Sequence, residues 1–489
     1  MKFFGWRWLA VSSMMAGAML AGALSAKAET RPQYGGLLHV AMRAAPATLN
    51  PVELAGVSYG QEDAFARRNL TMLMFDTLVT TDESGRMQAA LATSWQASSR
   101  QVSGAQTGNE RWEFHIRRGV RFHDGTALSS EIVAASLRAA NPGWNVRAEA
   151  DSVVIEREGR DPAWLAELTL PRNAIVKANP DGVPSGTGPF HVVDWQPGKK
   201  LTLAAEENCW RGRPFLDGIE IEMGMSFRDQ MTAFDLGTTE LVEVAPEQAR
   251  QLSQGRTSQN QASQNQTSRA GRQVRYSAPV ELLALVFTRD AASADEKLLR
   301  EALAWSVERG SIRSVLLQGA GQPAASILPN WMSGYGFVFS SDADLPRARQ
   351  ARQQVRAIPT WSLGYDGDDP LDRLLAERIA LNAKDAGLSL QPTPGANADL
   401  RLVRIPLASA EPWIALANVA KVTGTDTGKE GGTVEELYTA ERSLLATQRV
   451  IPLFHLPVWY ATAGTLKRWT VRPDGSWNLA DAWLDEGGP

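Results

Sequence analysis

The chain has 489 residues, which is long enough for two or three domains with buried cores. Its formal net charge is −4, and this acidic balance argues against nucleic acid or an anionic membrane surface as the partner. The single cysteine, Cys209, excludes an internal disulfide, so burial must stabilise the fold. Whether Cys209 is a small buried hydrophobe or a reactive thiol stays open at this point.

The first residues have the order of parts of a secretory signal peptide. Lys2 and Arg7 are followed by an apolar run from Trp8 to Leu24, and Ala26-Lys27-Ala28 places small side chains where a signal peptidase reads them. We expect cleavage after Ala28, because the run is short for the alternative, a retained membrane anchor. Removing these 28 residues from 489 leaves 461, and the three lost basic residues take the charge from −4 to −7.

The segment contains no cysteine for lipid attachment, and no later stretch has the composition of a transmembrane helix. The sequence therefore predicts a periplasmic protein that is not anchored to the membrane.

The exported part has the pattern of a mixed α/β protein. In one run, Trp112, Phe114 and Ile116 alternate with polar residues, as in a half-buried strand. Strands are predicted, in chain order, at Gly36–Met42, Trp112–Arg117, Ser152–Glu156, Lys200–Ala204, Ile219–Met223, Leu282–Phe287 and Leu400–Ile405.

Three helices can be placed from their caps and apolar faces. Ser129 is expected to cap a helix that runs through Ala140, and Asp295 a longer one. A third carries Leu371, Leu375 and Ile379 on one face and should end at Gly387. Two polar segments are expected to be a hairpin tip and a flexible surface insertion, respectively Gln101–Asn109 and Ser253–Arg272.

The chain lacks an H-E-x-x-H pair and a phosphate-binding loop. His115 and His123 are eight residues apart, which is not a metal-ligand spacing. Asp366, Asp368 and Asp369 are too few for a calcium loop and suit a solvated loop or a helix cap. We therefore expect neither an enzyme nor a bound cofactor or metal. The 16 tryptophans suit either core packing or a pocket that holds a ligand by apolar contact.

Several motifs together resemble the solute-binding proteins of ABC importers known as family 5, the oligopeptide, dipeptide and nickel group. The most specific is W-E-F-H-I-R-R-G-V-R-F-H-D-G-T-A-L, residues 112–128. Other matching segments, in the same order as in the family, are Gly35–Leu38, Ala47–Pro51, Phe75–Val79, Leu91–Trp95, Gly186–Phe190 and Asn208–Pro214. Leu298–Arg309 and Trp477–Asp481 match more loosely, so the resemblance is strongest in the N-terminal half.

The resemblance implies a two-lobed periplasmic binding protein of type II, with an extra subdomain on the first lobe and a hinge of crossing strands. The first lobe would comprise residues 29–60, 186–280 and 456–489, the subdomain 61–185 and the second lobe 281–455. Such proteins close around a ligand held between the lobes. The Gly186–Pro189 stretch suits a backbone turn near the lobe crossing and is interpreted as structural.

Peptide-binding members hold the ligand's amino terminus with an aspartate of the second lobe. Aligning Glu411-Pro412 with the family's second acid and proline puts Ala408 where that aspartate belongs. Either Glu411 takes over the role or the ligand has no free amino terminus, and we favour the second. The candidate ligand-binding residues are Glu411, Trp413, Trp331, Arg404 and Thr48.

The first hypothesis is therefore a monomeric periplasmic subunit that delivers a peptide or other small polar solute to ABC permease subunits. The second is an orphan binding protein that acts as a sensor, chaperone or ligand-presenting partner without its own transporter. An exported hydrolase is the third, and the missing catalytic motifs weigh against it.

Overall fold

The computed structural model describes residues 31–52, 63–82, 85–100, 109–157, 164–179, 182–258, 271–367, 369–407, 409–427 and 431–485. The predicted signal peptide and its cleavage site after Ala28 lie outside the described residues. So do most of the predicted hairpin tip, the central part of the predicted insertion, and Ala408.

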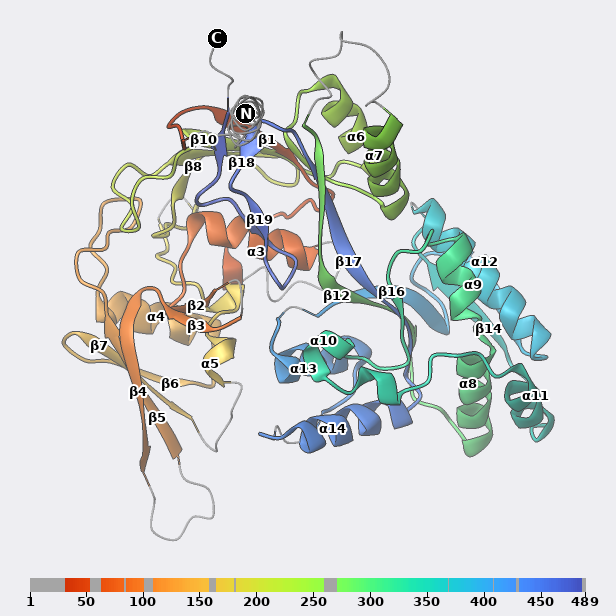
Figure 1. Ribbon diagram of the computed structural model, residues 1–489. Coiled ribbons are helices and arrows are strands. Elements are labelled where there is room, and N and C mark those ends of the chain that lie inside the picture. Colours follow the sequence, from red (N-terminus) through yellow and green to blue (C-terminus); the bar gives the residue numbers. More distant parts are fainter. Residues whose placement is uncertain are drawn as a thin grey trace, which may run out of the picture.

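One large mixed sheet runs through the two halves of the molecule (Figure 1). In the described part of the chain its strands have the order β15-β14-β16-β12-β17-β11-β1-β10-β9-β8, with β13 paired to β17 at one side. Their bounds are β1 Leu37–Ala41, β8 Phe190–Gln196, β9 Lys200–Ala205, β10 Gly218–Glu222, β11 Leu241–Glu243, β12 Gln273–Phe287, β13 Gln322–Pro323, β14 Thr360–Tyr365, β15 Ser389–Pro394, β16 Leu400–Pro406 and β17 Val450–Thr462.

Two long antiparallel strands, β12 and β17, connect the halves (Figure 1). The far end of β17 pairs with β11 of the first lobe, whereas the last residues of β12 pair with β16 of the second lobe. Their ladder shifts register on both sides of Pro279, where the chain passes from one lobe to the other. A register shift bends the strand and interrupts regular pairing, so this is the natural hinge. The two-lobed α/β fold with crossing hinge strands is confirmed.

A separate four-stranded antiparallel sheet lies within the range predicted for the subdomain, with strand order β4-β5-β7-β6. Phe114 on β5 and Val153 on β7 are fully buried there against Val133 and Leu137 of helix α4. The elements are β4 Ala92–Arg100, β5 Asn109–Ile116, α4 Ser130–Ala140, β6 Asn145–Ala148, β7 Ser152–Arg157 and α5 Trp164–Glu167, beside the hairpin β2 Val79–Thr81 and β3 Met87–Ala89. The numerical domain limits stay predictions.

Helices cover the faces of the large sheet and enclose the cores. The second-lobe strands have one core against α8 and α12 and another against α13 and α14. The remaining helices are α3 Asp63–Met74, α6 Phe227–Leu236, α7 Pro246–Ser258, α8 Ala294–Ser306, α9 Arg309–Val315, α10 Asn330–Ser333, α11 Leu345–Gln353, α12 Pro370–Asp385, α13 Pro412–Thr423 and α14 Val434–Ala446.

The structure confirms one of the two predicted helix caps and contradicts the other. Ser129 caps α4 by accepting a hydrogen bond from the Ile132 amide, as predicted. The cap predicted at Asp295 is wrong: Ser293 caps α8, because its side chain accepts from the amide of Glu296, and Asp295 lies in the first turn. Asp369 caps α12, which agrees with the helix-cap interpretation of the acidic cluster.

The Gly186–Pro189 turn packs against the end of α3. A Cβ atom on Gly186 would lie 2.0 Å from the Met74 carbonyl oxygen, and one on Gly188 would lie 2.5 Å from the Met74 carbonyl carbon. Only glycine permits this approach. Beside it, the buried Asp76 accepts hydrogen bonds from Thr187 Oγ1, Trp210 Nε1 and Arg211 Nη2. This stretch joins the subdomain to the first lobe, in agreement with its structural interpretation.

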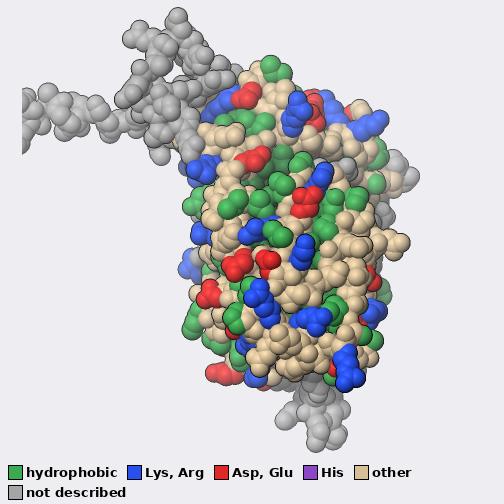
Figure 2. Space-filling view, turned by 90° about the vertical axis from the view of Figure 1, so that its right-hand side faces the viewer, with side chains coloured by type: hydrophobic (Ala, Val, Ile, Leu, Met, Phe, Trp, Pro, Cys, Tyr) green, Lys and Arg blue, Asp and Glu red, His purple; other side chains and the backbone are tan. Residues whose placement is uncertain are grey.

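The surface on the side of α11 and α12 is mixed in character. Figure 2 shows basic side chains scattered among acidic, apolar and uncharged ones on that face rather than gathered into a basic band. Cys209 is buried, and burial raises the pKa of its thiol, which keeps it protonated. Among the described residues, no helix has the length and apolar character needed to span a bilayer.

Candidate functional site

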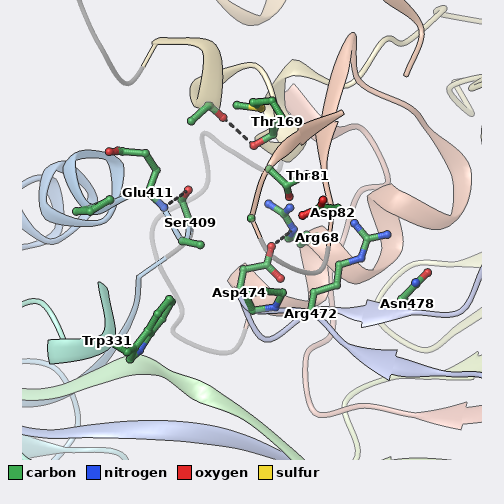
Figure 3. A pocket seen from close by; sticks show the side chains of 16 residues that line it. Arg68, Thr81, Asp82, Thr169, Trp331, Ser409, Glu411, Arg472, Asp474 and Asn478 are labelled. Carbon is green, nitrogen blue, oxygen red and sulfur yellow. Dashed lines mark hydrogen bonds and ion pairs between the residues drawn. The ribbon is translucent and has the colours of Figure 1, made fainter. Parts of the chain in front are cut away.

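A cavity of about 630 Å³ lies between the two halves of the molecule (Figure 3). One wall comes from the first lobe and its subdomain and the other from the second lobe. Its lining residues are Arg68, Thr81, Asp82, Gly85, Met87, Ala166, Thr169, Trp331, Ser409, Ala410, Glu411, Pro412, Arg472, Pro473, Asp474 and Asn478.

The first-lobe wall is built by α3 and by a hairpin near the C-terminus, β19 (Thr470–Val471) and β20 (Trp477–Asn478). Arg68 Nε lies 2.5 Å from Asp474 Oδ2, and both side chains are 8% exposed. Asp474 Oδ1 also accepts from the Ser476 amide and hydroxyl. Asn69 Oδ1 accepts from the Trp477 amide at 2.6 Å, which fixes the hairpin to the helix. The charged wall is therefore held in place before any ligand enters.

The second-lobe wall consists of the turn before α13 and of Trp331. Pro412 occupies the first turn of α13, and the Glu411 carboxylate caps this helix by accepting from the Ile414 amide at 2.9 Å. In Figure 3 the carboxylate points away from Asp474 and Arg68, toward the start of the helix. Glu411 thus lines the cavity while its carboxylate stabilises the helix terminus.

Trp331 lies on the short helix α10, opposite the charged wall in Figure 3. The residue is 41% exposed. The buried carboxylate of Glu441 binds the residues on either side of α10. Glu441 accepts from the amides of Ile327 and Leu328 and from the Tyr335 hydroxyl, the last at 2.7 Å. Burial raises the pKa of Glu441. Because these bonds flank α10 on both sides, they fix the position of the indole in the cavity.

Of the five predicted site residues, the structure brings Glu411 and Trp331 together in the cavity. Trp413 is 6% exposed and packs in the second-lobe core. Arg404 Nη2 lies 2.7 Å from Asp372 Oδ1 and 3.5 Å from Asp369 Oδ2. Burial works to lower the pKa of Arg404, but the neighbouring carboxylates of Asp372, Glu281 and Asp369 outweigh it and raise the pKa.

Thr48 accepts a hydrogen bond from the Asn50 amide at 3.1 Å in the loop after β1. Neither Thr48, Trp413 nor Arg404 is among the described residues that line the cavity. A ligand role for each of the five residues stays a prediction.

Arg68, Arg472 and Asp474 were missed, although they form the charged wall. About 400 residues separate Arg68 from Asp474 in the sequence, and no local pattern indicates that they meet. In the described part of the chain, no group of three or more His, Cys, Asp or Glu side chains is placed to hold a metal ion.

Comparison with known proteins assigns the fold to a family. The model of the bacterial extracellular solute-binding proteins, family 5 (middle region), matches residues 86–405, more than half of the chain. The chain belongs to this family. Family 5 members are extracytoplasmic binding proteins, which agrees with the predicted export.

Curated relatives of this family 5 protein are distant. It is 24% identical over 369 residues to heme-binding protein A of Haemophilus influenzae, covering 64% of this chain and 63% of that protein. It is 21% identical over 265 residues to the nickel-binding protein NikA of Staphylococcus aureus, covering 51% and 49%. The matched parts thus span less than two thirds of these relatives.

Solved structures share the fold over nearly the whole chain. A dipeptide-binding protein of Pseudoalteromonas sp. SM9913, in complex with Met-Leu, superposes with a TM-score of 0.73 at 15% identity, covering 92% of this chain and 100% of that one. NikA of Staphylococcus aureus, in complex with Ni(L-His)2, gives a TM-score of 0.71 at 15% identity, with the same coverage. At this identity the likeness supports the two-lobed fold.

Proposed function

We propose that this protein is the extracytoplasmic solute-binding subunit of an ABC importer, which captures a small polar solute between its lobes and presents it to a membrane permease. The observation that carries the proposal is the cavity of about 630 Å³, whose walls come from two lobes joined by β12 and β17. A ligand that touches both walls stabilises the closed arrangement over the open one. The permease would distinguish the closed form.

The size of the cavity limits the cargo. A volume near 630 Å³ lies within the range of ~300–1,000 Å³ that is typical of small-molecule sites. It suits a solute of about dipeptide size. Both walls carry charged groups, and Trp331, Met87 and Pro412 add apolar surface, so the ligand should combine polar groups with an apolar part.

Relatives named for transport support an importer over an orphan binding protein. The chain is 24% identical over 180 residues to the peptide transport periplasmic protein SapA of Salmonella typhimurium, over 36% of this chain and 30% of that protein. Family membership also argues against an enzyme, since the family consists of binding proteins. We further propose that the signal peptide is cleaved after Ala28 and that the exported protein is a monomer without a resident cofactor.

Native mass spectrometry of the protein purified from its own periplasm tests the proposal. We expect a bound small molecule that is released on unfolding and that raises the melting temperature when added back to the stripped protein. Small-angle scattering should show a smaller radius of gyration with the ligand. A protein recovered empty, together with no thermal shift across peptide and sugar libraries, would contradict ligand capture. N-terminal sequencing of the same sample tests cleavage after Ala28.

A further inference from the structure

The charged side chains that line the inter-lobe cavity are balanced within the protein. They are Arg68, Asp82, Glu411, Arg472 and Asp474, and Arg472, too, has an interaction partner in the fold. A further arginine, Arg86, lies outside the lining and pairs with Asp82 at 3.0 Å, so three arginines stand against three carboxylates. The cavity as a whole therefore offers no net counter-charge to a ligand.

The buried pair of the first-lobe wall shows how this balance acts on a ligand. Asp474 faces Arg68 with one oxygen and accepts from the Ser476 amide and hydroxyl with the other. An ionised ligand group that leaves water must regain its lost hydration from an opposite charge. An anion placed against Arg68 would meet Asp474 as well, and a cation placed against Asp474 would meet Arg68. An arginine whose charge is balanced can still donate to a neutral oxygen.

The other two acids are engaged in the same way. Asp82 accepts from the amide and Nε of Arg86 and from Nε2 of Gln88. Glu411 accepts from the Ile414 amide at the start of α13, where the helix dipole also offsets its charge. Both carboxylates thus have a positive partner in the protein and do not require one from the ligand.

A smaller cavity of about 300 Å³ adjoins the inter-lobe cavity, and the two share Thr81, Asp82, Arg472 and Asn478. Its other arginines are also paired. Arg211 binds the buried Asp76 at 2.6 Å, and Arg213 binds Glu207 at 2.9 Å. Asp481 is exposed, where water screens its charge. An extension of the ligand into this cavity would therefore meet balanced charges as well.

The uncharged polar side chains of the lining differ, because they keep free hydrogen-bonding capacity. Among the described residues, the side chains of Thr81 and Asn478 have no hydrogen-bond partner, and Figure 3 shows neither bonded to another lining residue. Ser409 accepts from the Glu411 amide, which leaves its hydroxyl hydrogen to donate. A carboxamide and a hydroxyl can each donate and accept, so these groups suit hydroxyls and amides of a ligand.

We infer that the cargo is an uncharged polar solute, which Thr81, Asn478 and Ser409 bind through hydrogen bonds while its apolar part lies against Trp331. The inference rests on the proposed function and adds the chemical class of the ligand: a molecule without ionised groups, whose polar groups are hydroxyls or amides. A neutral sugar and a peptide with both ends blocked share this chemistry, and the test below distinguishes them.

Two series of probes test the inference by isothermal titration calorimetry at pH 7. The peptide series consists of N-acetyl-alanyl-alanine amide, which is neutral, N-acetyl-alanyl-alanine, which is an anion, and alanyl-alanine amide, which is a cation. The sugar series consists of cellobiose and its acid, cellobionate. In the series that binds, the neutral member should bind about tenfold or more tightly than each charged member. The series that binds identifies the source of the neutral groups.

Single variants assign the selectivity to the free polar groups. Asn478→Asp keeps the shape but adds a carboxylate without a counter-charge, so it should shift the ratio of affinities about tenfold toward alanyl-alanine amide over the neutral peptide. Thr81→Val removes a hydroxyl and should weaken the neutral ligand about fivefold. The matched controls are Asn208→Asp and Thr202→Val, at first-lobe positions outside both cavities. They should change neither quantity, and melting curves establish that each variant is folded.

A charged probe that binds as tightly as the neutral member of its series overturns the inference, and so does the absence of binding by every probe. An unchanged ratio in Asn478→Asp, together with unchanged affinity in Thr81→Val, also overturns it. The proposed function is judged separately. If native mass spectrometry recovers an ionised ligand, the neutral class fails while ligand capture stands. If no ligand is recovered and no probe binds, both fail.

Discussion

The indole Nε1 of Trp331 donates a hydrogen bond of 2.8 Å to the carbonyl oxygen of Pro279. Trp331 lines the cavity, and Pro279 lies on β12 between two register shifts of the hinge ladder. A carbonyl at such a shift has no regular partner strand to bond, and the indole takes that place. The same side chain therefore connects the cavity to the hinge.

Two replacements of Trp331 separate its hydrogen bond to Pro279 from the surface that its ring gives to the cavity. Trp331→Phe keeps an aromatic ring but removes the donor, so we expect affinity for the natural ligand to fall about fivefold, the effect of one hydrogen bond of ~1 kcal/mol. Trp331→Ala also removes the ring surface and should lower affinity further. Amide hydrogen exchange in β12 near Pro279 should become faster in both variants, because the hinge loses a fixed bond.

Trp195→Phe is the matched control, since Trp195 lies on β8 in the first lobe, outside both cavities. It should change neither affinity nor exchange at the hinge. Unchanged exchange near Pro279 in Trp331→Phe would show that the bond does not stabilise the hinge.

Glu411 can be tested for its cap and for its charge independently. Glu411→Ala removes the hydrogen bond to the Ile414 amide and should lower the free energy of unfolding by about 1 kcal/mol. Glu411→Ser retains a capping oxygen without the charge and should be close to wild type in stability. Because the carboxylate points to the helix, we expect ligand affinity to be nearly unchanged in Glu411→Ser. Denaturant unfolding and calorimetry measure the two quantities.

A large loss of affinity in Glu411→Ser would instead indicate that the carboxylate turns to a cationic ligand group. That result would favour the alternative in which Glu411 replaces the family's aspartate, and it would favour a ligand with a free amino terminus.

Gly186 is expected to tolerate no side chain. In Gly186→Ala the new methyl group would lie 2.0 Å from the Met74 carbonyl oxygen, so the turn or the end of α3 must move. We expect a loss of at least ~2 kcal/mol in the free energy of unfolding, as for other overpacked sites. Gly143→Ala is the control, because a Cβ atom there meets nothing within 4 Å. Equal stability of the two variants would contradict the packing argument.

Local patterns predicted the elements and most of the architecture. The Ser129 cap, the alternation around Phe114 and the family-like motifs of the N-terminal half led to the correct fold, because each depends on neighbours within a few residues. The cap of α8 was placed wrongly although Ser293 and Glu296 have the spacing of a capping pair. In this segment two residue types suit a cap, and the geometry of the first turn decides between them.

The site was predictable only in part. Glu411 followed by Pro412 is a recognisable helix start, so its capping role had a local signal. No sequence pattern distinguishes Trp413 from Trp331. Trp413 packs into the second-lobe core from α13, whereas Trp331 is 41% exposed and lines the cavity. Arg68 meets Asp474 only because the C-terminal hairpin returns to α3. Such long-range pairs depend on the whole fold.

His455 should make the protein less stable in acid. It lies on β17, where Ile327 O is 3.0 Å from its Nε2, and burial lowers its pKa from 6.5 to about 4. The unfolded chain therefore binds a proton between pH 6.5 and 4 that the folded protein does not. The stabilisation is complete above pH 6.5 and is lost as the pH falls toward 4, by on the order of 3 kcal/mol.

Glu441 must be separated from this effect, because it bonds to the amide of the same Ile327. Burial raises its pKa, so its contribution has the opposite sign and decreases as the pH rises above the ordinary range of a carboxyl group. Urea titration from pH 4 to 7 gives the free energy of unfolding of wild type and of His455→Gln. Both proteins contain Glu441, so its contribution drops out of the difference between them. This difference should shrink as the pH falls. A His455→Gln difference that does not change with pH would contradict a buried neutral imidazole.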